Sequence, residues 1–169
     1  MKAIVGVFSA GLLAGCATQS PEKMPITTEQ REFVYEYSAA KSKQELFKVA
    51  RNYFALAAGD SKEITRVEDE TEGTIIGKGN ISWNYTTGSP VVPAIPCASR
   101  ASLIFIAKDG RARLQMRLEE GAVPEAQCGW HLPPKQDYPQ VVASFNRMAK
   151  GLESAINGDS AVDRLKATF

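Results

Sequence analysis

The chain has 169 residues, of which 44% are hydrophobic and 23% are charged, and its formal net charge is +1. Those proportions are typical of one folded domain and exclude a disordered, collagenous or multi-span membrane protein. Because the charge is almost balanced, nothing in the composition draws the protein towards nucleic acid or anionic lipid. One histidine and three cysteines leave few residues for nucleophilic or metal chemistry.

The first sixteen residues have the pattern of an export signal. Lys2 precedes a twelve-residue apolar run from Ala3 to Ala14, and this run is shorter than the roughly 20 residues that cross a bilayer as a helix. A basic start, a short apolar centre and a small-residue end are typical of a secretory signal peptide. The end of the segment, Leu13-Ala14-Gly15-Cys16, resembles the lipobox of bacterial lipoproteins.

This resemblance implies a lipid anchor at Cys16. In bacterial lipoproteins the peptide before the cysteine is removed and the thiol carries diacylglycerol, so residues 1–15 are the expected signal peptide. Two or three acyl chains hold a protein stably on a membrane. Ala17, rather than Asp, follows the cysteine, which favours the outer membrane, with the domain facing the periplasm. The alternative is an ordinary signal peptide with an unmodified Cys16.

The predicted elements begin after a linker. Residues 16–28 lack apolar periodicity and include two prolines, so we expect a flexible tether after the lipidated cysteine. The segment from Arg31 to Ser38 alternates apolar and polar side chains, which predicts a half-buried strand. A capping box at Ser42–Glu45 predicts the start of a helix that ends near Gly59.

Two strands are predicted next, a short one from Glu63 to Glu68 and a long one from Thr74 to Tyr85. Apolar side chains fall on one face of the long strand, and polar side chains, including Lys78, fall on the other. Gly77 and Gly79 lie inside this strand pattern with no helix behind them. They therefore favour a bulge or a bend over a phosphate-binding loop.

The next pair of strands forms a predicted hairpin across Asp109-Gly110, a dipeptide that suits a two-residue type I′ turn. If Lys108 pairs with Arg111, the register places apolar residues opposite one another on one face of the hairpin. Turn chemistry and side-chain alternation thus agree on one register. The predicted apolar pairs are Phe105 with Leu114, Leu103 with Met116 and Ala101 with Leu118, and the pairs on the other face are Ile106 with Arg113, Ile104 with Gln115 and Ser102 with Arg117.

A second helix is predicted from Asp137 to Asn157, because apolar residues recur there at helical spacing. Gly151 inside this helix costs about 1 kcal/mol relative to alanine, which indicates close packing. The order β-α-β-β-β-β-α predicts an α+β domain over residues 29–158, with an antiparallel sheet and both helices packed on one face. Residues 159–169 are the expected C-terminal tail.

This element order is similar to the TBP-like fold, and the segment from Tyr37 to Asn80 resembles a bacterial family known only as a domain of unknown function with that fold. The resemblance implies a TBP-like fold and a location in the cell envelope. It implies no catalytic residue, and binding of nucleic acid does not follow from the fold name. The matching features are the capped helix from Ser42, its aromatic end at Tyr53-Phe54, the Ser61-Lys62 strand start and the EGTIIGKG strand at Glu72–Gly79.

Cys97 and Cys128 remain once Cys16 is assigned to lipid. In an oxidising compartment an even pair predicts a disulfide, and the hairpin register brings both cysteines towards the same end of the sheet. Such a bridge stabilises a domain by roughly 3–4 kcal/mol on the chain-entropy account. The alternatives are two free thiols, or a metal site formed by Cys97, Cys128 and His131. No carboxylate or second histidine accompanies that trio, so we expect no metal and no cofactor.

Enzymatic chemistry has little support in the sequence. His131 is the sole histidine and precedes Leu-Pro-Pro, which favours local packing over catalysis. No paired-carboxylate signature is present either. We therefore expect a non-enzymatic interaction or structural module of the cell envelope that binds no nucleic acid. The alternative is a module that binds a small apolar ligand in a cavity between the sheet and the C-terminal helix, lined by Phe33, Tyr35, Trp83 and Phe145.

The polar face of the hairpin is the candidate surface for a partner. Arg111 extends the row formed by Arg113 and Arg117, and Lys78 lies on the polar face of the long strand. Planar guanidinium groups suit carboxylates and phosphates. The hypothesis is that this row contacts an acidic patch on an envelope protein or an anionic envelope polymer. The alternative is an ordinary solvated face.

Overall fold

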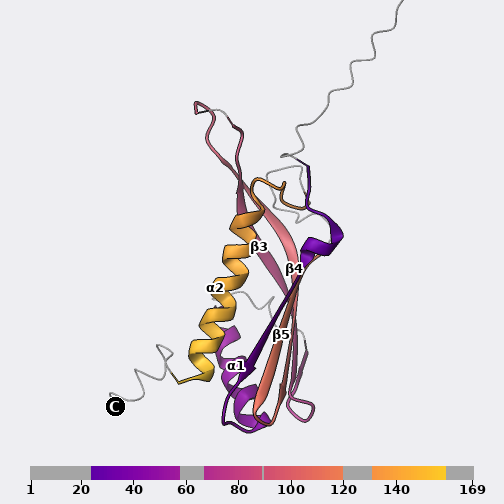
Figure 1. Ribbon diagram of the computed structural model, residues 1–169, viewed down its shortest axis with the longest axis vertical. Coiled ribbons are helices and arrows are strands. Elements are labelled where there is room, and N and C mark those ends of the chain that lie inside the picture. Colours follow the sequence, from indigo (N-terminus) through magenta and orange to yellow (C-terminus); the bar gives the residue numbers. More distant parts are fainter. Residues whose placement is uncertain (1–23, 58–66, 89, 120–130, 159–169) are drawn as a thin grey trace, which may run out of the picture.

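Five strands and two α-helices make up most of the part of the chain that the computed structural model describes, which comprises residues 24–57, 67–88, 90–119 and 131–158. The predicted order β-α-β-β-β-β-α is confirmed, and a short 3₁₀ helix, η2, precedes the first strand (Figure 1). The bounds are η2 Thr28–Arg31, β1 Glu32–Ser38, α1 Lys43–Ala57, β2 Val67–Asp69, β3 Thr74–Tyr85, β4 Ile95–Lys108, β5 Arg111–Leu118 and α2 Tyr138–Ile156.

The five strands form one antiparallel sheet in the order β1-β5-β4-β3-β2. In three of the four pairs of neighbouring strands the two strands are consecutive in the sequence, as in a β-meander. The remaining pair joins the first strand to the last, because β1 lies against β5, with Tyr35 opposite Leu114. This non-local pairing places the side chains of β1 beside the arginines of β5.

The predicted hairpin register is confirmed at every pair from Lys108–Arg111 to Ala101–Leu118. The predicted type I′ turn is wrong, because that turn needs a positive φ at both central residues, whereas only Gly110, at 79°, has one. The segment that leads into α1 holds this turn through hydrogen bonds. The backbone N–H of Lys43 donates to Asp109 Oδ1 at 2.7 Å, and Gly110 N–H donates to the carbonyl of Lys41 at 2.9 Å.

Strand β3 has the predicted bounds but no bulge. It pairs with β4 residue by residue over its whole length, so Gly77 lies opposite Leu103 and Gly79 opposite Ala101. The bulge considered for these glycines is therefore absent. The same pairing brings two buried polar groups together further along the strand, where Trp83 Nε1 donates to Ser99 Oγ at 3.0 Å.

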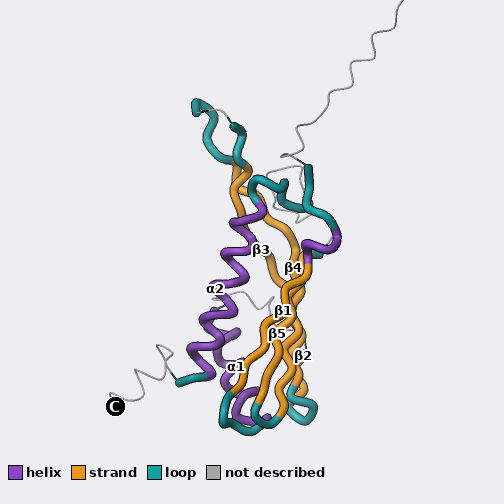
Figure 2. The backbone as a smooth tube through the Cα atoms, viewed as in Figure 1, coloured by secondary structure: helices purple, strands orange, loops and turns teal. Residues whose placement is uncertain are grey.

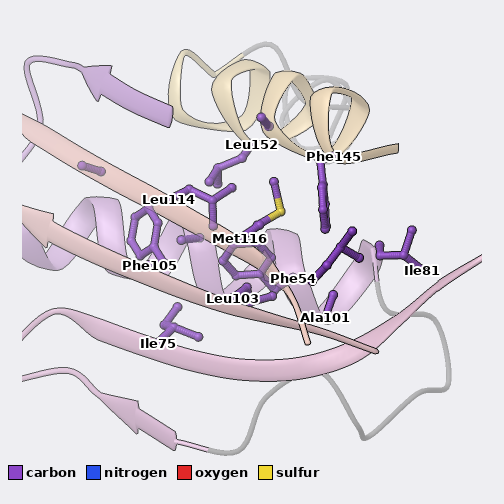
Figure 3. Packing of buried hydrophobic residues seen from close by; sticks show 14 of the residues in the cluster. Phe54, Ile75, Ile81, Ala101, Leu103, Phe105, Leu114, Met116, Phe145 and Leu152 are labelled. Atoms are coloured by element: carbon purple, nitrogen blue, oxygen red, sulfur yellow. The ribbon is translucent and has the colours of Figure 1, made fainter. Parts of the chain in front are cut away.

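Both helices cover one face of the sheet, and the hydrophobic core lies between the two layers (Figures 1 and 3). The capping box that starts α1 is formed: Ser42 N–H donates to Glu45 Oε2 at 2.8 Å, and Glu45 N–H donates to Ser42 Oγ at 3.3 Å. Apolar residues at helical spacing then face the sheet, as amphipathic helices require. Core residues from the two layers include Phe54, Phe145 and Leu152 from the helices and Ile75, Phe105, Leu114 and Met116 from the sheet.

The two helices also contact each other, at the position where the sequence predicted close packing (Figure 2). A Cβ atom added to Gly151 of α2 would lie 3.0 Å from Cε2 and Cζ of Tyr53 of α1, and nearer still to its hydroxyl. That hydroxyl donates to the carbonyl of Met148 at 2.9 Å. Glycine therefore permits the ring to lie directly on α2.

The chain joins the domain before the expected tether boundary at Thr28. Ile26 is buried, its N–H donates to the carbonyl of Pro133 at 3.2 Å, and Lys135 N–H donates to the carbonyl of Met24 at 2.9 Å. The segment thus forms a short antiparallel bridge with the residues before α2. Of the expected tether, only residues 16–23 lie outside the described residues.

Candidate functional site on the open face of the sheet

The face of the sheet opposite the helices carries the predicted arginine row. Residues alternate between faces along a strand, so Arg111, Arg113 and Arg117 of β5 share this open face and are all exposed, as is Lys78 of β3. The expectation that these four residues share one face is in line with the alternation and register of the sheet. The structure does not bring them together as one group, however.

An apolar band crosses the middle of the open face. In the observed register, residues of all five strands stand side by side in one row, and Ile106 adjoins this row. Several of its members are substantially exposed, which is unusual for apolar side chains of this size that lie close together. The row consists of four apolar residues, Val34, Ile104, Ile76 and Val67, together with Gln115, which lies between Val34 and Ile104.

On one side of this band lies a basic depression of about 500 Å³ at the β4–β5 turn. Lys108, Arg111 and Arg113 supply three positive charges to its lining, Ile106 supplies apolar surface and Glu36 supplies one carboxylate. Guanidinium groups at the rim of an apolar surface suit a ligand that carries both carboxylates and apolar groups. Two of the predicted arginines therefore line this depression.

Arg117 and Lys78 lie on the other side of the band. They belong to one row, in which Ser102 stands between them, so their Cα atoms are about 10 Å apart. Arg117 follows Arg111 by six positions of extended strand, about 20 Å. Glu119 lies close to this row, because Ser102 Oγ donates to Glu119 Oε1 at 2.6 Å. The predicted row is thus two basic groups separated by apolar side chains.

Sequence reasoning missed two acidic residues of this face. Glu32 stands opposite Arg117 and Glu36 opposite Arg113, because β1 pairs with β5. Glu32 accepts a hydrogen bond from Gln115 Nε2 at 3.0 Å, and within the described part of the chain neither Arg113 nor Arg117 forms an ion pair. The alternation of β1 does place both glutamates on its polar face, but only the pairing with β5 makes them neighbours of the arginines.

The remaining predicted site residues lie away from the open face. Cys97 is buried on the helix-covered face of β4, opposite Trp83. Cys16 and Cys128 lie outside the described residues, so the lipid anchor and the disulfide stay predictions. His131 is exposed, and no cluster of three or more potential metal ligands is found among the residues that are described.

The four side chains expected to line a ligand cavity pack together with the core instead. The rings of Phe33 and Phe145 have centroids 4.7 Å apart, Trp83 is buried, and Tyr35 OH donates to Asn146 Oδ1 at 2.8 Å. A depression of about 400 Å³ does lie beside Trp83, between the end of β3 and α2. Its lining is mixed and includes Asn84, Gln140 and Arg147 as well as the tryptophan.

Tyrosine hydroxyls tie α2 to its neighbours on the covered side. Tyr37 OH donates to the carbonyl of Ala149 at 3.2 Å, and Tyr53 bonds the same helix, as described above. Burial raises the pKa of both tyrosines above the ordinary value because a buried phenolate loses its hydration. Both hydroxyls donate to backbone carbonyls of α2 and so position the helix.

Comparisons with known proteins give information on the fold of this chain. No protein-family model and no curated protein matches the chain. A TBP-like protein from Parabacteroides distasonis matches 79% of this chain and 97% of its own, at 10% identity with a TM-score of 0.56. A DUF4468 family protein from Bacteroides ovatus matches at 14% identity with a TM-score of 0.45, over 55% of this chain.

The chain spans 56% of the length of that DUF4468 protein. The first of the two likenesses confirms the predicted class: the protein has a TBP-like α+β fold with two helices on one face of an antiparallel sheet. At 10% identity the likeness concerns the fold alone. Within the described residues no helix has the length and apolar character needed to cross a membrane.

Proposed function

We propose that this protein is a lipid-anchored, non-enzymatic module of the bacterial cell envelope that binds a partner through the open face of its sheet. Cys16 is the proposed anchor, on the strength of its lipobox-like context, and the outer membrane facing the periplasm is the proposed location. The single observation that supports the binding role is the open face itself, where a band of exposed apolar side chains lies between two basic groups.

The chemistry of this face indicates the kind of partner. Lys108, Arg111 and Arg113 surround the depression at the β4–β5 turn, with one carboxylate among them, while the adjoining band is apolar. A protein segment that carries acidic and apolar side chains matches both features. An anionic envelope polymer would use the basic groups and leave the apolar band unused, so we favour a protein.

Binding of a small apolar ligand is the less supported alternative. This alternative requires a cavity lined by Phe33, Tyr35, Trp83 and Phe145. In the structure the rings of Phe33 and Phe145 contact each other, and Trp83 is buried. The depression beside Trp83 keeps this alternative open to test. A ligand bound there would contact Gln140 and Arg147 rather than the arginines of β5.

The test is capture of a partner from the protein's own membranes. The full chain is purified from detergent-extracted membranes, and its co-purifying proteins and small molecules are identified by mass spectrometry. The same purification reports whether Cys16 carries lipid. Replacing Arg111, Arg113 and Arg117 by Ser is expected to reduce capture of the specific partner at least about tenfold, as loss of interfacial charges does, and to preserve the fold because these residues are exposed.

A matched control removes the same charge from the helix layer. Arg51, Arg147 and Lys150 are exposed on α1 and α2, and their replacement by Ser is expected to leave capture unchanged. Equal capture by the native chain and the β5 variant, with native circular dichroism in both, would exclude the open face. Loss of capture only in the control would move the binding surface to the helices.

A further inference from the structure

The loop between β3 and β4 lies at the end of the molecule where the chain enters the domain. Thr86, the first residue after β3, donates its hydroxyl to Asp137 Oδ1 at 2.7 Å and its N–H to Asp137 Oδ2 at 3.2 Å. Asp137 directly precedes α2, and Pro134, three residues earlier, pairs with Pro25. These contacts fix the loop next to the entry point, and both are at the same end of the molecule (Figures 1 and 2).

This loop is unusual in charge and in exposure. No charged residue occurs between Lys78 and Arg100, a stretch of 21 residues in a chain that is 23% charged. At its tip, in the sequence Pro-Val-Val-Pro, Val91 is 87% exposed and Val92 is 49% exposed. Apolar side chains at a projecting, uncharged tip are typical of segments that contact another apolar phase.

The distance to the expected anchor is short. Met24 follows Cys16 by eight positions, and a fully extended chain of that length spans about 27 Å at most. Val91 follows Thr86 by five residues, so the tip projects by up to about 17 Å from the same end. A domain held at Cys16 thus has its apolar tip within reach of the surface that holds it.

We propose that Val91 and Val92 of the β3–β4 loop contact the lipid bilayer, a membrane contact that rests on the proposed anchor at Cys16. Two valines are too small a surface to hold a protein on a membrane alone. Their role is to orient the anchored domain. Strand β4 runs about 40 Å from the loop to the β4–β5 turn, so this orientation presents the basic depression to the compartment, away from the bilayer.

A fluorescence experiment tests this contact directly. The full chain with Val91→Trp is placed on vesicles of phosphatidylethanolamine and phosphatidylglycerol whose acyl chains carry bromine, a contact quencher of tryptophan. The emission of the unsubstituted chain is subtracted, because Trp83 and Trp130 are native. The matched control is Val67→Trp, at another exposed valine, on β2 at the far part of the sheet.

The expected result is about twofold or greater quenching at position 91 and none at position 67, since interfacial side chains enter the headgroup and acyl boundary. Equal emission with and without bromine at position 91 would overturn the proposal and leave a protein partner as the occupant of the tip. A Cys16→Ser chain is measured in parallel. Loss of membrane attachment only in that chain supports the anchor, whereas attachment unchanged by Cys16→Ser overturns the anchor and leaves the quenching at position 91 to decide the loop contact.

Discussion

The contact between Gly151 and Tyr53 allows a prediction whose sign opposes helix propensity. In an open helical position, Gly151→Ala would stabilise the protein by about 1 kcal/mol. Here the new Cβ would meet two ring carbons of Tyr53 at 3.0 Å and lie nearer still to its hydroxyl. The ring cannot easily withdraw, because it packs edge-on against Phe54 with a centroid distance of 5.6 Å, and its hydroxyl is bonded to Met148.

The expected magnitude follows from these contacts. Overpacking of this kind costs about 1–3 kcal/mol, and loss of the Tyr53–Met148 hydrogen bond costs about 1 kcal/mol more. After the propensity gain of about 1 kcal/mol, Gly151→Ala should lower the free energy of unfolding by about 1–3 kcal/mol. For a domain of this size that corresponds to a fall in Tm of roughly 3–10 °C.

Urea unfolding followed by circular dichroism measures the effect, and a second background checks its cause. In a Tyr53→Ala chain the three atoms nearest the new Cβ are gone, so Gly151→Ala should there be neutral or stabilising by up to about 1 kcal/mol. A stabilising Gly151→Ala in the native background would refute the packing argument. Equal destabilisation in both backgrounds would assign the cost to another neighbour.

Three further predictions concern a disulfide, the polar contacts of Asp137 before α2 and the cap at the start of α1. Cys97 and Cys128 should appear as one cross-linked peptide pair when the mature protein is mapped without reduction, and free thiols at both positions or stoichiometric zinc would contradict this. Asp137→Ala should lower the free energy of unfolding by about 2–4 kcal/mol, since it leaves two donors of Thr86 without their buried acceptor; a loss no larger than that of the exposed control Asp69→Ala would count against it. Lowering the pH should weaken the cap of α1. The hydrogen bond from the Ser42 backbone lowers the pKa of Glu45, so its stabilisation is present above the pKa of the unfolded chain and is lost as pH falls through the lower folded value; a Glu45→Gln chain with the same acid transition would show that this carboxylate contributes nothing.

Features that depend on residues close together in the sequence could be predicted, as the β4–β5 hairpin shows. The two residues Asp109-Gly110 set the loop length, and the alternation on both sides allowed one register, which is the one observed. The turn type was mispredicted because Asp109 is held by Lys43, a residue 66 positions earlier in the chain. Gly151 was likewise predicted to pack closely, but its neighbour Tyr53 could not be named from local pattern.

Non-local pairing limited what could be predicted about the site. The arginines of β5 were placed on the correct face, yet their neighbours depend on β1, and nothing in the alternation of β1 specifies which strand it joins. For the same reason the apolar band was missed, because its members come from five strands and only the assembled sheet aligns them. The pairing of Met24–Ile26 with the residues before α2 was not predicted either, since three residues are too few for a periodic pattern.

The account's central claim is that the open face of the sheet binds a partner while the domain is held at the membrane. Site-specific photocrosslinking in the intact cell envelope tests it most directly, with a photoreactive amino acid in place of Ile106, which adjoins both the band and the basic depression. The control carries the same group at Arg51 of α1. We expect one discrete crosslinked protein from position 106, none from position 51, and its loss when Arg111, Arg113 and Arg117 are also replaced by Ser. No crosslink at position 106, or one that survives the arginine replacements unchanged, would contradict the proposed function.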